Sequence, residues 1–136
     1  MKVFVCVDKN GGIMFNKRRV SQDSVLRKRI IEICEGSPLY MSEYSSKQFE
    51  DFKDNIKADD NFVSLCKKDD FCFMEDIPVP PEKIDELYLF NWNRNYPSDI
   101  KLSFNPEKEG LKKISSTDFE GSSHEKITMT VYKKEN

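Results

Sequence analysis

Short apolar runs along the chain predict a sheet of six strands. In the run 87–92, Leu87 and Leu89 would face one side of the sheet, and Phe90 and Trp92 the other, since side chains alternate along a strand. The run 127–133 alternates in the same way. The predicted strands are Lys2–Val7, Pro38–Met41, Phe71–Met74, Leu87–Trp92, Leu111–Ser116 and Ile127–Lys133.

A helix is predicted over residues 22–35, where apolar side chains recur every three or four positions. Ser21 is the predicted N-cap. Asp23 falls in the first turn, where a negative charge suits the helix dipole. Gly36 follows the last apolar position and is placed to end the helix.

A second helix is predicted to begin at a capping box of Ser45 and Gln48 and to bury Phe49 and Phe52. Residues 54–70 are mostly polar and suggest only a short strand or a helical turn near Phe62. Because helices separate the early strands and the last strands follow one another directly, the order predicts a single α/β domain over residues 1–136, with an antiparallel pair at the end.

Composition places the 136-residue, 16.0 kDa chain among folded proteins, because ten Phe and five Tyr accompany a charged fraction of 34%. No apolar run approaches a membrane span and no segment resembles a signal peptide, so we expect a soluble, cytoplasmic protein with no membrane partner. His124 is the single histidine, which excludes metal sites built from several imidazoles. The four cysteines are expected to be buried free thiols that act as small hydrophobic side chains.

Charge is unevenly distributed, since residues 1–31 carry eight basic side chains against two acidic ones, although the whole chain has a net charge of −2. A basic end can attract a phosphate, whereas a solvated, ion-paired surface is the commoner outcome. No lysine or arginine run is long enough to suggest a nucleic-acid partner.

Several segments resemble the dihydrofolate reductase family. Residues 3–13 resemble its first strand and the start of its active-site loop, and Ser21-Gln-Asp23 resembles the opening of its first long helix. Residues 35–41 resemble its Gly-x-Pro-Val-Ile-Met strand, and residues 124–134 its last strand. The resemblance implies a dihydrofolate reductase-like three-layer fold, in which helices flank the sheet, the cofactor subdomain is trimmed and an antiparallel hairpin ends the chain.

The chain departs from this family where the family binds its dinucleotide. Glu43 replaces an arginine that holds phosphate, and Glu75 and Asp76 stand where the family has a Gly-Gly pair. Phe90 replaces a threonine, and the Leu-Pro-Trp of the active-site loop is missing. We therefore expect no NADPH site and no other cofactor.

The resemblance also suggests site residues. Asp23 falls on the family's proton-relay acid, although a carboxylate that only supports the helix N-terminus is the commoner arrangement. The loop of Arg18 and Arg19 would lie beside residues 119–124, so a small anion site is one interpretation. An Arg–Glu tether between the two loops, through Glu120 or Glu125, is the other. The candidate ligand-binding residues are Arg18, Arg19, Ser21, Trp92, Ser122, Ser123 and His124.

Two further arrangements involve aromatic and hydroxyl side chains. Trp92, with Arg94 and Tyr96, would either stack on a ligand ring or pack beneath a loop, and packing is favoured. A nucleophilic triad of Asp23, His124 and a neighbouring serine is disfavoured, because adjacent residues of a strand face opposite sides.

The sequence thus favours a binding module for a small anionic or nucleotide-like ligand, held in the former pterin cleft or the arginine-rich loop. One alternative is a protein-interaction or structural module that uses an exposed sheet edge, with a homodimer as its outcome. The other is a residual reductase with Asp23 as proton donor.

Overall fold

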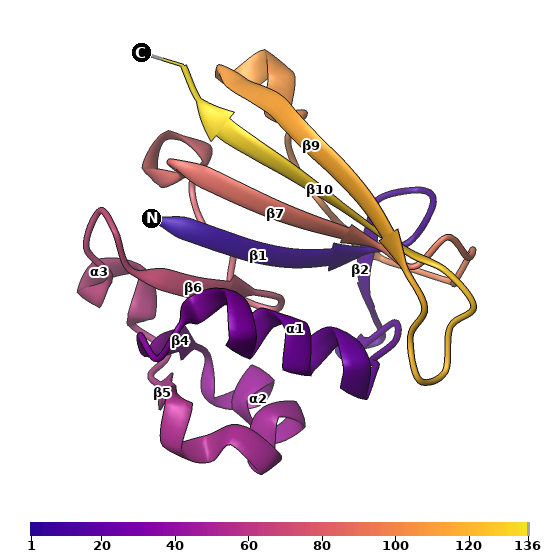
Figure 1. The fold of residues 1–136 in the computed structure, drawn as a ribbon, viewed down its shortest axis with the longest axis horizontal. Helices are drawn as coiled ribbons and strands as arrows, with labels where there is room; N and C mark the ends of the chain where they lie inside the picture. Colours follow the sequence, from indigo (N-terminus) through magenta and orange to yellow (C-terminus); the bar gives the residue numbers. More distant parts are fainter. Residues whose placement is uncertain (136) are drawn as a thin grey trace.

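The computed structural model describes residues 1–135 and has a mixed α/β fold built on a seven-stranded sheet (Figure 1). The order of strands in this sheet is β5-β4-β6-β1-β7-β10-β9. Its strands are β1 (Lys2–Val7), β4 (Leu39–Met41), β5 (Ile56–Ala58), β6 (Phe71–Met74), β7 (Glu86–Asn91), β9 (Leu111–Phe119) and β10 (Ile127–Lys134). A small antiparallel sheet has the order β3-β2-β8 and contains β2 (Gly12–Phe15), β3 (Arg18–Arg19) and β8 (Ile100–Lys101).

The central strand β1 pairs in parallel with β6 on one side and with β7 on the other. β4 continues the parallel part of the sheet, pairing with β6 and β5. β10 runs antiparallel to both β7 and β9, so the predicted antiparallel pair at the end of the chain is confirmed. The carboxyl ends of the parallel strands consequently meet at one edge of the sheet.

Helix α1 (Ser24–Cys34) begins two residues later than predicted, and its N-cap is Asp23 rather than Ser21. The backbone of Asp23 is still extended, and its carboxylate accepts hydrogen bonds from the N–H groups of Val25 and Leu26. A carboxylate that accepts two of the unpaired N–H groups caps a helix well, which explains the later start.

The predicted second helix is a short α2 (Glu43–Ser46) followed by a 3₁₀ segment (Lys47–Asn55). Its N-cap is Ser42, whose hydroxyl accepts from the N–H of Ser45, so the capping box at Ser45 was the wrong prediction. The remaining helical segments are α3 (Phe62–Leu65) and the 3₁₀ turns Pro81–Lys83 and Pro106–Glu109.

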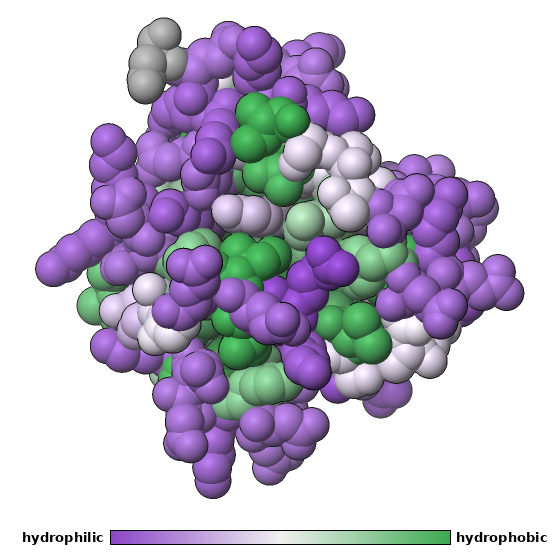
Figure 2. All heavy atoms as spheres, viewed as in Figure 1, coloured by the Kyte–Doolittle hydropathy of each residue, from purple (hydrophilic) through white to green (hydrophobic). Residues whose placement is uncertain are grey.

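Apolar side chains fill both faces of the main sheet. Phe4, Phe90 and Trp92 pack on the face covered by α1, whereas Val5 and Leu87 pack on the opposite face. The predicted alternation of residues 87–92 between the two faces is therefore confirmed. Outside this core, Figure 2 shows hydrophilic residues over most of the visible surface, with smaller hydrophobic areas between them. Within residues 1–135, no helix is long and apolar enough to cross a membrane.

Candidate functional site

Two polar clusters lie at the edge of the sheet where the parallel strands end, which is where ligands bind in open α/β sheets. The Asp23 cluster joins the start of α1 to the loop before β10. The Glu75 cluster joins the residue after β6 to α2 and to the β2–β3 hairpin. The Asp23 cluster consists of Ser21, Asp23, Tyr96, Ser123 and His124, and the Glu75 cluster of Arg19, Tyr44, Ser45, Gln48 and Glu75.

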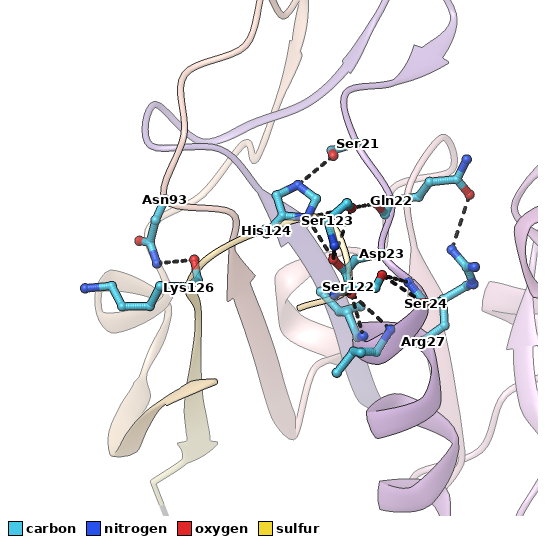
Figure 3. Close-up of polar contacts among 12 residues, drawn as sticks. Ser21, Gln22, Asp23, Ser24, Arg27, Asn93, Ser122, Ser123, His124 and Lys126 are labelled. Atoms are coloured by element: carbon cyan, nitrogen blue, oxygen red, sulfur yellow. Dashed lines mark hydrogen bonds and ion pairs between the residues drawn. The ribbon is translucent and has the colours of Figure 1, made fainter. Parts of the chain in front are cut away.

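The buried carboxylate of Asp23 holds the loop before β10 against α1 (Figure 3). Its Oδ1 accepts from the N–H of Ser122 at 3.0 Å, in addition to the two N–H groups of the helix. Its Oδ2 accepts from the N–H of Ser123 at 2.9 Å and contacts Nδ1 of His124 at 2.9 Å. Gly121 leaves the space this requires, because a Cβ there would lie 2.4 Å from Oδ2.

These contacts fix the charge state of Asp23. Burial acts to raise the pKa of Asp23, but hydrogen bonds from Ser123, His124, Ser122 and Leu26 hold it well below its ordinary value. Asp23 is therefore a negatively charged acceptor at neutral pH. Its partner at Nδ1 must then be a donor, so this nitrogen of His124 carries a proton.

The imidazole of His124 is fixed on several sides. Its Nε2 lies 2.8 Å from Oγ of Ser21 and 3.2 Å from the hydroxyl of Tyr96. Its ring stacks on that of Trp92, with centroids 4.4 Å apart. With 3% of His124 exposed, the ring cannot turn away from these partners without disturbing the core.

The Glu75 cluster is organised by a two-point ion pair. Arg19 donates from Nε to Oε2 of Glu75 at 3.1 Å and from Nη2 to Oε1 at 3.3 Å. The hydroxyl of Ser45 and the amide of Gln48 donate to the same carboxylate at 2.9 and 3.2 Å. The guanidinium also lies over the ring of Tyr44, 4.6 Å from its centroid.

Burial raises the pKa of Glu75, while the charge of Arg19 and the hydrogen bonds from Arg19 and Ser45 oppose that shift. The pKa values of the two buried carboxylates at this edge of the sheet are therefore shifted in opposite directions. Asp23 receives enough donors to outweigh its burial, whereas Glu75 does not.

A cavity of about 560 Å³ lies between the β2–β3 hairpin and the loop after β7, and is called the Arg18 cavity below. Arg18 is exposed at this cavity, and within residues 1–135 it has no ion-pair partner. Arg19 is only partly exposed because Glu75 holds it. The residues that line the cavity are Phe15, Asn16, Arg18, Arg19, Val20, Tyr96 and Pro97.

The structure brings most of the predicted site residues together, although not in one set. Ser21, Asp23, Ser123 and His124 meet directly, and Ser122 contacts both Asp23 and the hydroxyl of Ser24. Arg18 and Arg19 line the neighbouring cavity. Arg19 pairs with Glu75, rather than with the Glu120 or Glu125 that a tether between the two loops would use.

Trp92 packs in the core and is 2% exposed, in agreement with the packing interpretation. Its Nε1 has no hydrogen-bond partner among the described residues. Trp92 also borders a separate cavity of about 330 Å³, together with Lys9, Asn93, Arg94, Glu125 and Lys126.

The sequence did not indicate the contact of Tyr96 with Ser21 and His124, nor the pairing of Glu75 with Arg19. Tyr96 stood out only as an aromatic neighbour of Trp92, and Glu75 only as a charge that opposes phosphate. A carboxylate directly after the apolar run Phe71–Met74 was the available signal, because a buried acid requires a partner.

Metal binding finds no support in residues 1–135, where no group of three or more His, Cys, Asp or Glu side chains is placed to hold an ion. Cys6, Cys34, Cys66 and Cys72 are free thiols, as predicted, and burial raises the pKa of Cys34 to about 12. Cys34 and Cys72 are buried, as expected, whereas Cys6 and Cys66 are partly exposed, so the expectation of burial is wrong for these two. Comparison of the chain with protein-family models and with curated proteins finds no match.

Proposed function

We propose that the chain binds a small anionic, nucleotide-like ligand in the Arg18 cavity. The observation that carries this proposal is the exposed guanidinium of Arg18, which lines the cavity without an ion-pair partner in residues 1–135. A guanidinium offers parallel N–H donors that match a phosphate or a carboxylate. A ligand that carries such a group would complete the coordination of Arg18.

The other residues of the cavity favour a ligand that is also partly apolar. Phe15 is 43% exposed, and Val20 and Pro97 add apolar surface beside it. Tyr96 contributes an aromatic ring and a hydroxyl. Small-molecule sites combine apolar and aromatic lining with a few placed polar groups, and this cavity has the same composition.

A relationship to dihydrofolate reductase remains our proposal for the fold. It is supported by the parallel strands β4, β6 and β1, by Asp23 at the start of the first helix and by the antiparallel β9–β10 pair. The residues after β6 do not fit NADPH, because Glu75 and Arg19 fill the place where the resemblance implies a Gly-Gly pair. We therefore propose a trimmed fold of this type without an NADPH site.

Residual reductase activity with Asp23 as proton donor is disfavoured. Asp23 is 2% exposed, and both of its carboxylate oxygens already accept several hydrogen bonds. A general acid needs a pKa near the working pH, whereas the pKa of Asp23 is held far below it.

A protein-interaction role through a sheet edge is less well supported. β5 forms one edge but has three residues, and the longer edge strand β9 carries Lys112, Lys113 and Asp118. Charged side chains on an edge strand oppose pairing with another chain. We expect sedimentation velocity to give a monomer of about 16.0 kDa, and a dimer would revive this alternative.

The proposal is tested by thermal-shift titration with AMP, GMP, inorganic phosphate, folate, dihydrofolate and NADPH. A ligand of the native state raises the free energy of unfolding by about 2.7 kcal/mol at a hundred times its Kd, and the unfolding midpoint rises with it. We expect a shift with a mononucleotide or phosphate and none with NADPH. Arg18→Ala should weaken that binding roughly 10- to 100-fold, because a charge-assisted contact is lost.

The matched control is Arg27→Ala, which removes a guanidinium of α1 that lies outside the cavity and, among residues 1–135, donates only to Gln22. It should bind as the unsubstituted chain does. Equal losses in both variants would indicate a general charge effect and would contradict the proposal. A clear shift with NADPH would contradict the proposal that Glu75 and Arg19 leave no NADPH site.

A further inference from the structure

Three side chains of the Asp23 cluster form a continuous hydrogen-bonded series (Figure 3). The carboxylate of Asp23 contacts Nδ1 of His124 at 2.9 Å, and Nε2 of the same ring contacts Oγ of Ser21 at 2.8 Å. Asp23 and His124 are buried, whereas Ser21 is partly exposed. A carboxylate, an imidazole and a reachable hydroxyl in this order are the components of nucleophilic acyl transfer.

We propose that Ser21 is a nucleophile activated by His124, and that the chain hydrolyses small carboxylic esters through an acyl-Ser21 intermediate. Asp23 is the positioning residue: it holds Nδ1 as a donor, so that Nε2 is free to accept the proton of Ser21. The hydroxyl of Tyr96, 3.4 Å from Oγ of Ser21, supplies a donor for the oxygen of the tetrahedral adduct.

The two steps use only the ester and water. In the first, Oγ of Ser21 bonds to the carbonyl carbon and its proton passes to Nε2 of His124. The C–O bond to the leaving group then breaks, and the departing alcohol takes that proton. In the second, water attacks the acyl carbon and gives a proton to Nε2, and Oγ of Ser21 leaves with this proton as the carboxylic acid is released.

The neighbouring serines do not have this geometry. Oγ of Ser123 lies 3.2 Å from Nδ1, the nitrogen that donates to Asp23 and cannot also accept a proton. Oγ of Ser122 accepts from both the hydroxyl and the N–H of Ser24. Ser21 is thus the serine whose hydroxyl faces the basic nitrogen, which the phenolic hydroxyl of Tyr96 also contacts. The sequence did not suggest it, because Ser122 and Ser123 adjoin His124 in the chain.

We place the substrate in the Arg18 cavity, which adjoins Ser21 although Ser21 is not among its lining residues. Val20 precedes Ser21, the hydroxyl of Tyr96 contacts both Ser21 and His124, and Val20 and Tyr96 both line the cavity. A substrate here would be an ester whose acyl part carries an anionic group for Arg18. This choice of substrate rests on the proposed function, whereas the nucleophilic role of Ser21 does not.

The test uses 4-nitrophenyl acetate, a neutral activated ester that does not require the anion-binding role of Arg18. We expect a burst of nitrophenolate, and peptide mapping of the unsubstituted chain should find the acetyl group on Ser21. Ser21→Ala should lower the rate of acylation more than about 100-fold, because general-base-assisted attack is lost. His124→Asn should lower it similarly while leaving the hydroxyl in place.

Ser115→Ala is the matched control, because Ser115 is an exposed serine of β9 outside both clusters. It should be acetylated at Ser21 at the unsubstituted rate. Acetyl groups found only on lysines or the N-terminus, or equal rates in Ser21→Ala, would overturn the proposal. Peptide mapping of the unsubstituted chain gives this answer even if a variant fails to fold. Failure of acylation is also distinct from failure of ligand binding, since the thermal-shift titration measures the latter alone.

Discussion

The Asp23 and Glu75 clusters each contain a buried carboxylate at the same edge of the sheet, but they satisfy it differently. The negative charge of Asp23 is stabilised mainly by backbone N–H groups, those of Val25, Leu26, Ser122 and Ser123, which the fold holds in place. Glu75 depends on side chains, chiefly Arg19. Backbone donors lose little entropy when they bind, whereas side chains must be ordered for the purpose.

This difference gives the two clusters different roles: the Asp23 cluster stabilises the fold, and the Glu75 cluster contains an ion pair that can rearrange. Asp23 ties α1 to the loop before β10, so its loss affects the whole fold. Arg19 lines the Arg18 cavity as well as pairing with Glu75, so this ion pair can respond to a ligand. Substitutions in the Asp23 cluster should therefore cost more stability than substitutions in the Glu75 cluster.

The largest effect is expected for Asp23→Asn. The new amide group would face the N–H of Ser123 and Nδ1–H of His124, which are both donors, so hydrogen bonds are lost in a buried site. Urea unfolding at pH 7 should show a loss of roughly 3 kcal/mol. Asp118→Asn, at an exposed residue of β9, should cost less than about 0.5 kcal/mol. Similar losses in the two variants would contradict the central role of Asp23.

Gly121→Ala should have the next largest effect. Its Cβ would lie 2.4 Å from Oδ2 of Asp23 and 2.9 Å from a methyl group of Ile127, and neither neighbour has room to move. We expect a loss of about 1–3 kcal/mol in the same unfolding measurement. Unchanged stability would mean that the loop does not pack on Asp23 as described.

Glu75→Gln should cost less, about 1 kcal/mol at pH 7. The amide retains one acceptor for Arg19, and the guanidinium, which is 17% exposed, can recover hydration from the cavity. The same variant should alter ligand affinity, because Arg19 loses its negatively charged partner. A loss of stability as large as that of Asp23→Asn would remove the distinction between the two clusters.

The smallest expected effects are in the pH dependence of stability, which should differ between the two carboxylates. The pKa of Asp23 is lowered on folding, so its contribution is present above its ordinary pKa of 3.8 and is lost as the pH falls below it. The pKa of Glu75 is raised, so its contribution is present below its ordinary pKa of 4.5 and is lost as the pH rises. Unfolding should be measured between pH 3 and pH 7.

In that series, the stability difference between the unsubstituted chain and Asp23→Asn should narrow toward pH 3. The difference for Glu75→Gln should instead favour the unsubstituted chain more at pH 4 than at pH 7. Parallel trends for the two variants would show that folding does not shift the pKa values of the two carboxylates in opposite directions.

The sequence predicted the strands better than the caps and the site contacts. Val3–Val7 and Phe71–Met74 are uninterrupted apolar runs, and the structure has the strands Lys2–Val7 and Phe71–Met74 with the predicted bounds. Ser21 and Asp23 both suit an N-cap, so the choice depends on where the chain leaves its extended conformation, which tertiary contacts decide. Ser42 and Ser45 present the same ambiguity. β2 was missed because Gly11 and Gly12 indicated only a turn.

The site contacts join residues about a hundred positions apart, as in the pair Asp23 and His124. The family resemblance suggested that these loops meet, but local patterns carry no such information. The expectation that Ser123 and His124 face opposite sides assumed a strand. They lie in the loop before β10, where both side chains approach Asp23.

The central claim is that an anionic, nucleotide-like ligand binds in the Arg18 cavity. Its most direct test is a titration of ¹⁵N-labelled protein with AMP, followed by NMR. Binding in the Arg18 cavity should shift the amide signals of residues 15–20 and 96, and these shifts should weaken in Arg18→Ala but persist in Arg27→Ala. Shifts confined to the cavity of Lys9, Arg94 and Lys126, or no saturable shift with AMP, would contradict it.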